Sequence, residues 1–250
     1  MRPSTVLVST LAVVAHAAPA FPELNIKNLA NPVNALDSLS TYLSLVAIKV
    51  QNGKATKKAP QCDLSRAQMP LNGLPSPDAG LTVRHVAVGR GTQNYTCDAN
   101  NANAVPKAAG AVATLFNVSC IASMYPDLVE RMPDMAVNFD LETTKTLGPT
   151  VVPVSGVHFF TDATTPFFNL DTPSMDIGEA PCAKNSSVQA PSTAAVGQIG
   201  DTAVPWLKLT TKNGATGNIK EVYRVNTAGG NPPTTCKGQP AAFQVQYSAV

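Results

Sequence analysis

The sequence predicts a mainly β protein, folded as a single antiparallel β-sandwich or barrel-like domain with long loops. Short runs rich in β-branched and aromatic residues recur from residue 62 onward, and clusters of turn-forming residues separate them. Proline (21) and glycine (16) are frequent, as expected for a fold with many turns. Hydrophobic residues make up 44% of the chain, so the chain can bury a sizeable core.

The predicted strands are, in chain order, "LTVRHVAV", "TQNYTC", "AGAVATLFNVSCI", "TVVPVSGVHFFT", "AVPWLKLTT", "IKEVYRV" and "AAFQVQYSA". The predicted loops between them include "DANNANAVPK", "NLDTPSMDIGEAPCAKNSS", "TKNGATGN" and "NTAGGNPPTT". One or two short helices are expected. The clearest covers residues 125–135, where Pro126 fits the first helical turn.

Two segments are predicted in front of the β-rich domain at 62–250. Residues 1–17 combine Arg2, a short apolar run and a small-residue cleavage site, which is the pattern of a secretory signal peptide; a buried N-terminal helix is the alternative. Residues 18–61 predict a helical segment and a polar linker. No apolar stretch reaches the length of a membrane span, so we expect a secreted, extracellular protein.

Cysteines and sequons agree with export. The five cysteines are Cys62, Cys97, Cys120, Cys182 and Cys236. None of their spacings resembles a zinc site, so in an oxidising compartment we expect disulfide bonds, one thiol left over and no metal. Three Asn-x-Ser/Thr sequons predict a glycoprotein, with candidate glycans on Asn94, Asn117 and Asn185.

The stretch "HVAVGRGTQNYTC" (residues 85–97) allows two interpretations. Gly89 and Gly91 match the first two positions of the G-x-G-x-x-G motif, in which glycines let the backbone approach a dinucleotide pyrophosphate at a helix N-terminus. Asn94 stands at the third position, and a strand-like run follows where the motif needs a helix. We therefore favour a turn leading into a strand and expect no cofactor.

The strand interpretation assigns side chains to faces, because successive residues of a strand point to opposite sides. Asn94 and Thr96 would share the solvent-exposed face. Gln93, Tyr95 and Cys97 would share the inward face. An inward cysteine in an oxidising compartment is a candidate for a disulfide.

A hydrolase site is the one catalytic hypothesis that the residues allow. After residue 17 the chain holds two histidines, His85 and His158, too few for a three-histidine zinc site. No G-x-S-x-G motif supports a lipase-like serine nucleophile. The catalytic candidates are His158, Asp162 and Arg224. Convergence of His158, a carboxylate and Arg224 in one open pocket would favour an enzyme, and their dispersal would favour a binding module.

Trp206, the only tryptophan, is a candidate binding residue. On a strand it shares a face with Lys208, while Leu207 and Leu209 form the other face, which we expect to be the core. Trp206 then either stacks against a sugar as an exposed platform or is covered by a second layer of the protein, and covered tryptophans are commoner.

Five blocks together resemble a fungal secreted family known as domain of unknown function 3455: "HVAVGRGTQNYTCD", "AVATLFNVSC", "HFFTD…TPFFNL", "AVPWLKL" and "VYRVNTAGG…PPTTC". The resemblance covers residues 62–247. Members are often labelled malate dehydrogenase, a label that the broken dinucleotide motif does not support. The resemblance marks Gly89, Gly91, Gln93, Tyr95, Cys97, His158, Trp206, Leu207, Arg224, Thr227, Gly229, Gly230 and Cys236.

The family resemblance also implies a Cys97–Cys236 bridge, because relatives tend to keep a cysteine in each of these two blocks. For the remaining cysteines we expect a Cys62–Cys120 bridge, which would clamp the N-terminal edge of the β-rich domain. Cys182 lies in a predicted polar loop and is expected to be free.

These observations favour a secreted, disulfide-stabilised, glycosylated protein with a binding or structural role at a surface or in an extracellular matrix. The expected partner is a cell-wall or host carbohydrate. An extracellular hydrolase acting on carbohydrate or ester substrates is the alternative. Nucleic acid is not an expected partner, because the formal net charge is only +2 and charged residues make up 14% of the chain.

Overall fold

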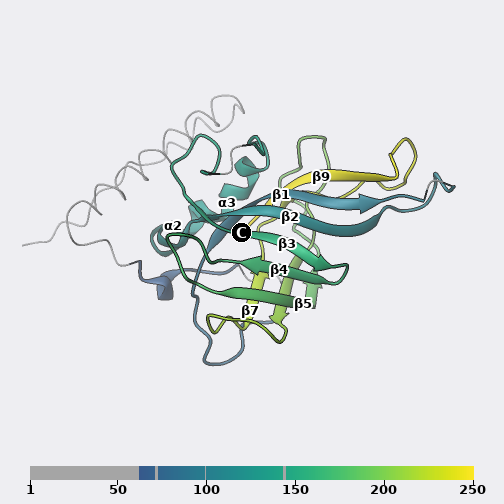
Figure 1. Ribbon diagram of the computed structural model, residues 1–250. Coiled ribbons are helices and arrows are strands. Elements are labelled where there is room, and N and C mark those ends of the chain that lie inside the picture. The colour runs from purple at the N-terminus through teal and green to yellow at the C-terminus, as the bar shows by residue number, and fades with distance from the viewer. Residues whose placement is uncertain (1–61, 71–72, 99, 143–144) are drawn as a thin grey trace, which may run out of the picture.

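The structure is a computed structural model that describes residues 62–250 apart from 71–72, 99 and 143–144. In this part the chain forms one antiparallel sheet of nine strands, curled into a half-barrel (Figure 1). The strands are β1 (Ala87–Thr96), β2 (Lys107–Asn117), β3 (Val154–Asp162), β4 (Thr165–Asn169), β5 (Glu179–Val188), β6 (Trp206–Thr211), β7 (Glu221–Arg224), β8 (Ala228–Gly229) and β9 (Ala242–Ala249). The mainly β, barrel-like prediction is confirmed. The predicted signal peptide (1–17) and helical segment (18–61) lie outside the described residues.

The strand order is β7-β6-β5-β4-β3-β2-β1-β9-β8, so β9 returns to pair with β1. The two edges of the sheet approach each other at one end. There Val225, after β7, and Val250, after β9, exchange two backbone hydrogen bonds of 2.8 and 2.9 Å. Ala203, just before β6, pairs with Gly230, just after β8. These links bend the sheet and give it an enclosed interior face.

Strand β1 runs through Gly89 and Gly91 without a turn, so the predicted turn is wrong while the strand predicted over "TQNYTC" is confirmed. The strand predicted over residues 81–88 is wrong for 81–86, because β1 begins only at Ala87. A Cβ on Gly91 would overlap the carbonyl oxygen of Val112 on β2, so glycine is needed for the close approach of these two strands. The stretch therefore offers no glycine-rich turn in front of a helix, which is what a dinucleotide site requires.

Strand β5 lies in a stretch predicted to be a polar loop, and that prediction is wrong. Ala180 and Cys182 are its buried positions, whereas Lys184, Asn185 and Ser187 are exposed. Few large apolar residues mark this strand in the sequence. It is held by pairing with β4 on one side and β6 on the other, which local composition does not report.

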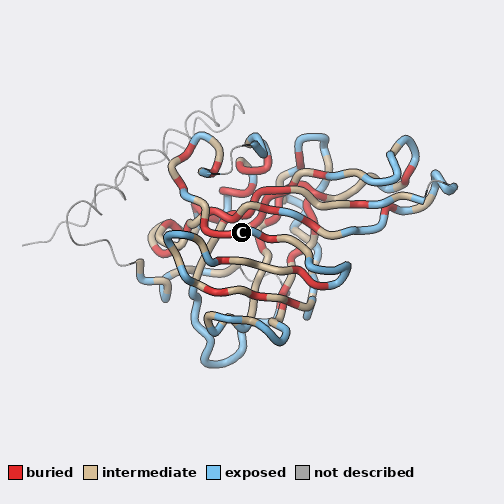
Figure 2. The backbone as a smooth tube through the Cα atoms, viewed as in Figure 1, coloured by how far each residue is buried: buried red, intermediate tan, exposed pale blue. Residues whose placement is uncertain are grey.

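Two helices, α2 (Ser119–Met124) and α3 (Pro126–Ala136), pack against the other face of the sheet, and α3 confirms the helix predicted over 125–135. The run predicted as a strand to Ile121 instead ends at Asn117, whose side-chain oxygen accepts a hydrogen bond from the Ser119 N–H. The core beneath the helices consists of Val88, Phe116, Val118, Ile121, Ala122, Leu128, Val129, Met132, Ala136, Leu147 and Val152. Figure 2 shows how buried residues concentrate along the strands.

Both expected disulfides are present. Cys62 bonds to Cys120, with Cα atoms 4.8 Å apart, and Cys97 bonds to Cys236, with Cα atoms 5.6 Å apart. Cys182 is free, as expected, but it is buried in β5 and does not lie in a polar loop. Burial raises the pKa of its thiol to about 12, so it stays protonated at neutral pH.

Candidate functional site

A cavity of about 1360 Å³ lies along the interior face of the half-barrel and extends past residues 67–70 and 80–87 to α3. Typical small-molecule sites occupy about 300–1000 Å³, so this space is large enough for a ligand. Its walls are mainly apolar and include Phe160, Phe168, Leu207, Leu209 and Val222. Polar side chains at a few positions interrupt these walls, and they define the candidate site.

His158 projects from β3 into this cavity and is 7% exposed. Its ring stacks on Phe168, with ring centres 4.3 Å apart, and meets the edge of Phe160 at 5.6 Å. Its Nδ1 donates a hydrogen bond of 3.0 Å to the carbonyl oxygen of Phe167. Burial, aided by the positive charge of Arg224, lowers the pKa of His158 to about 4. The ring is therefore neutral at pH 7, and its Nε2 is left as a hydrogen-bond acceptor.

Arg224, at the end of β7, is partly buried and lines the same cavity. Its Nε and Nη2 donate hydrogen bonds of 3.2 and 2.8 Å to the carbonyl oxygen of Pro205. No described carboxylate forms an ion pair with it. Burial lowers the pKa of its guanidinium group, while the neighbouring Tyr247 and Tyr95 favour the charged form.

Tyr95 and Tyr247 complete the polar group on the cavity wall. The Tyr95 hydroxyl donates a hydrogen bond of 2.7 Å to the carbonyl oxygen of Gly230, and burial raises its pKa to about 12. Tyr247 is 3% exposed, and burial raises its pKa as well. Gly230 has a φ of +98°, and a Cβ there would collide with Tyr247, so only glycine fits beside these rings.

Gln93 lies in the same wall, on β1 beside Tyr95 and Tyr247. Its side-chain nitrogen is buried and makes no hydrogen bond of standard geometry in the described part of the chain, although the Gln93 side chain interacts with the Tyr247 hydroxyl and partly offsets the rise in the pKa of Tyr247. A buried donor without a partner costs free energy, so it is a natural contact for a ligand acceptor. Alternation along β1 had assigned Gln93 and Tyr95 to the inward face, and both do line the cavity.

Asp162 lies away from this polar group. It ends β3 and is exposed at the turn to β4, where its carboxylate accepts hydrogen bonds of 2.7 and 2.8 Å from the Thr164 N–H and hydroxyl. Hydrogen bonds from Thr165 and then Thr164 lower its pKa to about 2. The structure thus brings His158 and Arg224 to one cavity and leaves Asp162 at a surface turn.

Trp206 is 4% exposed and packs with Leu74, Val188, Val225 and Tyr223. A sugar reaches its ring only if the segment around Leu74 moves away. Lys208, on the same face, is buried too, although the sequence had placed the core only on the leucine face. Both faces of β6 are covered.

Residues 74–78 cover the face of β6 that carries Trp206 and Lys208. The Lys208 Nζ lies 2.8 Å from a Glu221 carboxylate oxygen and 3.3 Å from one of Asp78, and it donates a hydrogen bond of 2.9 Å to the carbonyl oxygen of Ser76. The Glu221 carboxylate is the main reason why the pKa of Lys208 is raised. This segment is distant from β6 in sequence, so spacing within β6 does not report it.

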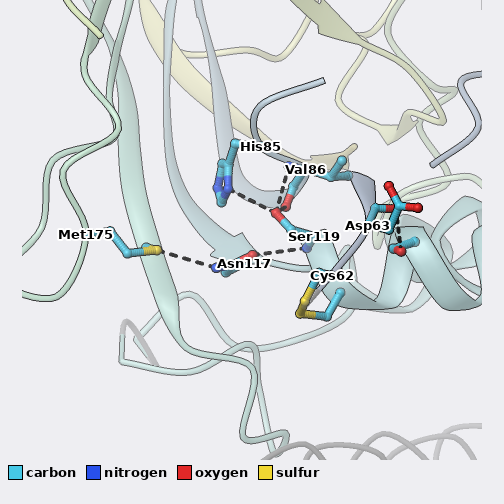
Figure 3. The surroundings of a disulfide bond; sticks show 9 residues. Cys62, Asp63, His85, Val86, Asn117, Ser119 and Met175 are labelled. Atoms are coloured by element: carbon cyan, nitrogen blue, oxygen red, sulfur yellow. Dashed lines mark hydrogen bonds between the residues drawn. A yellow bond between two sulfur atoms is a disulfide. The ribbon is translucent and has the colours of Figure 1, made fainter. Parts of the chain in front are cut away.

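His85 belongs to a separate cluster near the Cys62–Cys120 bond (Figure 3). Its Nε2 lies 2.9 Å from the Ser155 Oγ, and its Nδ1 lies 3.1 Å from the Ser119 Oγ. The Ser119 hydroxyl also accepts a hydrogen bond from the Val86 N–H. Burial lowers the pKa of His85 to about 4. These contacts tie the segment before β1 to α2 and β3.

The three sequon asparagines differ in their surroundings. Asn185 is exposed on β5. Asn94 is half-buried on the face of β1 that also carries the exposed Thr96. Asn117 is half-buried, and its side-chain nitrogen donates to the Met175 sulfur at 3.4 Å (Figure 3). In the described part of the chain, no three His, Cys, Asp or Glu side chains gather to hold a metal ion, and no helix is long and apolar enough to cross a membrane.

Comparison with protein families matches residues 77–250 to a family described as protein of unknown function (DUF3455). The match covers most of the range in which the sequence blocks resemble that family, and it continues to the last residue. No curated protein and no solved structure matches the chain. The matched residues run from just before β1 through β9, so they include the half-barrel and its cavity. The chain therefore belongs to the DUF3455 family.

Proposed function

We propose that this protein is a secreted, glycosylated binding protein of a surface or extracellular matrix, and that the half-barrel cavity is its ligand site. The observation that carries the proposal is a large, mainly apolar cavity into which a neutral His158 and the partly buried Arg224 both project. Concave, mostly apolar sites with a few convergent polar groups are typical of small-molecule binding.

The arrangement favours binding over hydrolysis. A hydrolase of the expected kind needs a carboxylate beside His158, and Asp162 lies at an exposed turn instead. Glu221 lies on the face of β7 opposite to Arg224, where it is paired with Lys208. The other nitrogen of His158 donates to a carbonyl oxygen, and no described carboxylate orients the ring.

The proposed location draws on two independent observations. The N-terminal 17 residues have the pattern of a signal peptide, and the β-rich domain carries two disulfides, which persist in oxidising compartments. A dehydrogenase role has no support, because β1 continues through both glycines of the broken dinucleotide motif.

Binding is tested with the secreted full chain and an anilinonaphthalene dye, whose fluorescence rises in apolar sites. We expect saturable binding of one dye per chain. Leu207→Trp, which adds bulk on the cavity wall, should weaken binding at least tenfold. Val112→Trp adds bulk on the exposed outer face of β2 and should leave binding unchanged. Dye that binds both variants equally would place the ligand elsewhere.

The same preparation separates the alternatives. Calorimetric titration with NAD should give no heat of binding, and ester and glycoside substrates should not be turned over. Cell-wall oligosaccharides are titrated as competitors of the dye. Turnover that His158→Gln abolishes, while the fold is retained by circular dichroism, would replace the binding proposal with the hydrolase.

Expression in a eukaryotic secretory host should deliver the protein to the medium with glycans. We expect Asn185 and Asn94 to be modified, because Asn185 is exposed and Asn94 lies beside the exposed Thr96. Asn117 is expected to carry less glycan, since its amide nitrogen is already engaged. Peptide mass spectrometry with and without deglycosylase measures each site. Retention of the chain inside the cell, or an unchanged mass after deglycosylase treatment, would contradict the expectation.

A further inference from the structure

We infer that the cavity binds an apolar carboxylic acid, with Arg224 as the anchor for its carboxylate. The inference rests on the proposed function, since it names the class of ligand for the same cavity. Three features carry it: the charge of Arg224, the unused donors around it, and the apolar walls beyond them.

Arg224 brings a positive charge to the cavity without a described counter-charge. Two of its N–H groups go to the Pro205 carbonyl oxygen, and no described carboxylate pairs with it. Glu221 is on the other face of β7, where it pairs with Lys208. A cation removed from water costs free energy unless a counter-ion and hydrogen bonds compensate it. A ligand carboxylate supplies both.

The nearby carboxylate and hydroxyls do not neutralise Arg224 themselves. Asp201 accepts a hydrogen bond from the Gly230 N–H, and its negative charge contributes to the raised pKa of Tyr95. Tyr95 and Tyr247 are neutral at pH 7, because burial raises the pKa of each. Their rings therefore contribute polar neighbours and no negative charge.

The groups next to Arg224 suit an acceptor with two oxygens. The remaining guanidinium N–H groups are donors, and so is the buried Gln93 amide, which carries two N–H groups beside the Tyr247 hydroxyl on the same wall. A carboxylate accepts up to about four hydrogen bonds, and charge-assisted bonds from a guanidinium group are the strongest of these. A neutral alcohol would satisfy fewer of these donors.

The rest of the cavity specifies the body of the ligand. His158 and Phe168 form a stacked pair, and Phe160, Leu207 and Leu209 extend the apolar surface. An aliphatic or aromatic body buries its apolar area here, whereas the hydroxyls of a sugar acid would find few partners. We therefore commit to an aliphatic or aromatic acid, and uronic-acid oligosaccharides become the contrasting arm of the test.

The test measures displacement of the anilinonaphthalene dye by decanoate, 3-phenylpropanoate, decanol and oligogalacturonate. Wild-type protein should bind decanoate at least tenfold more tightly than decanol. The Arg224→Gln variant should lose that preference, while its affinity for decanol should stay within about twofold of the wild-type affinity. Arg66→Gln removes an exposed arginine outside the cavity and should behave like wild type.

The wild-type comparison of acid and alcohol does not depend on whether Arg224→Gln folds. Equal affinities for decanoate and decanol would overturn the inference, and so would tighter binding of oligogalacturonate. In either case the dye still reports whether the cavity binds ligands, so the proposed function would stand. If the dye itself does not bind, the proposed function fails first.

Discussion

Replacing Cys97 and Cys236 together by serine is expected to lower the free energy of unfolding by about 5 kcal/mol. The bond joins residues 139 positions apart, so without it the unfolded chain gains the entropy of a long open loop. The same bond ties the residue after β1 to the segment in front of β9, two strands that pair in the sheet. Urea unfolding of the oxidised wild type and the double variant measures the difference.

The second bridge provides the matched comparison. Cys62 and Cys120 are 58 positions apart, so their replacement by serine should cost less, about 4 kcal/mol. Cys182→Ala should leave the bonding pattern unchanged, because this thiol is free. A Cys97/Cys236 variant as stable as wild type, or a Cys97 peptide linked to another cysteine in non-reducing peptide maps, would contradict the assignment.

Acid is expected to destabilise the fold between pH 6.5 and 4. Burial lowers the pKa of both His85 and His158 from 6.5 to about 4, so across this interval the unfolded chain binds more protons than the folded one. Stability is therefore greatest above pH 6.5, falls as the pH falls, and levels off below 4 as far as these two groups are concerned. Each histidine contributes about 3 kcal/mol to the loss.

Urea unfolding at pH 7 and pH 4.5 measures this effect. His158→Phe keeps a ring against Phe168, and His85→Gln keeps a hydrogen-bonding side chain between the two serines. Each variant should lose about half of the pH dependence, and the double variant most of it. Asp162 acts in a separate, lower window, because its pKa is lowered to about 2. A double variant with the full wild-type pH dependence would refute the role of the histidines.

Part of the candidate site was predictable from local pattern. Alternation along β1 placed Gln93 and Tyr95 inward, and the resemblance to the family marked His158 and Arg224, which share the cavity. Nothing in the spacing showed that Asp162 would stay outside it. The turn between β3 and β4 holds that carboxylate through Thr164, and only the pairing of the two strands shows where the turn points.

The sequence by itself determined the mainly β class, the helix that became α3, and, with the family resemblance, both disulfides. The β class and the helix depend on residue types and on periodicities within a few positions, whereas the Cys97–Cys236 pairing came from the family resemblance and the Cys62–Cys120 pairing from the places of these cysteines in the chain. The tertiary structure alone decided that β5 is a strand, that Trp206 and Lys208 are covered, and that Arg224 and His158 line one cavity. Each of these depends on contacts between segments far apart in the chain. Burial and charge pairing are properties of the packed neighbourhood, and local spacing does not contain them.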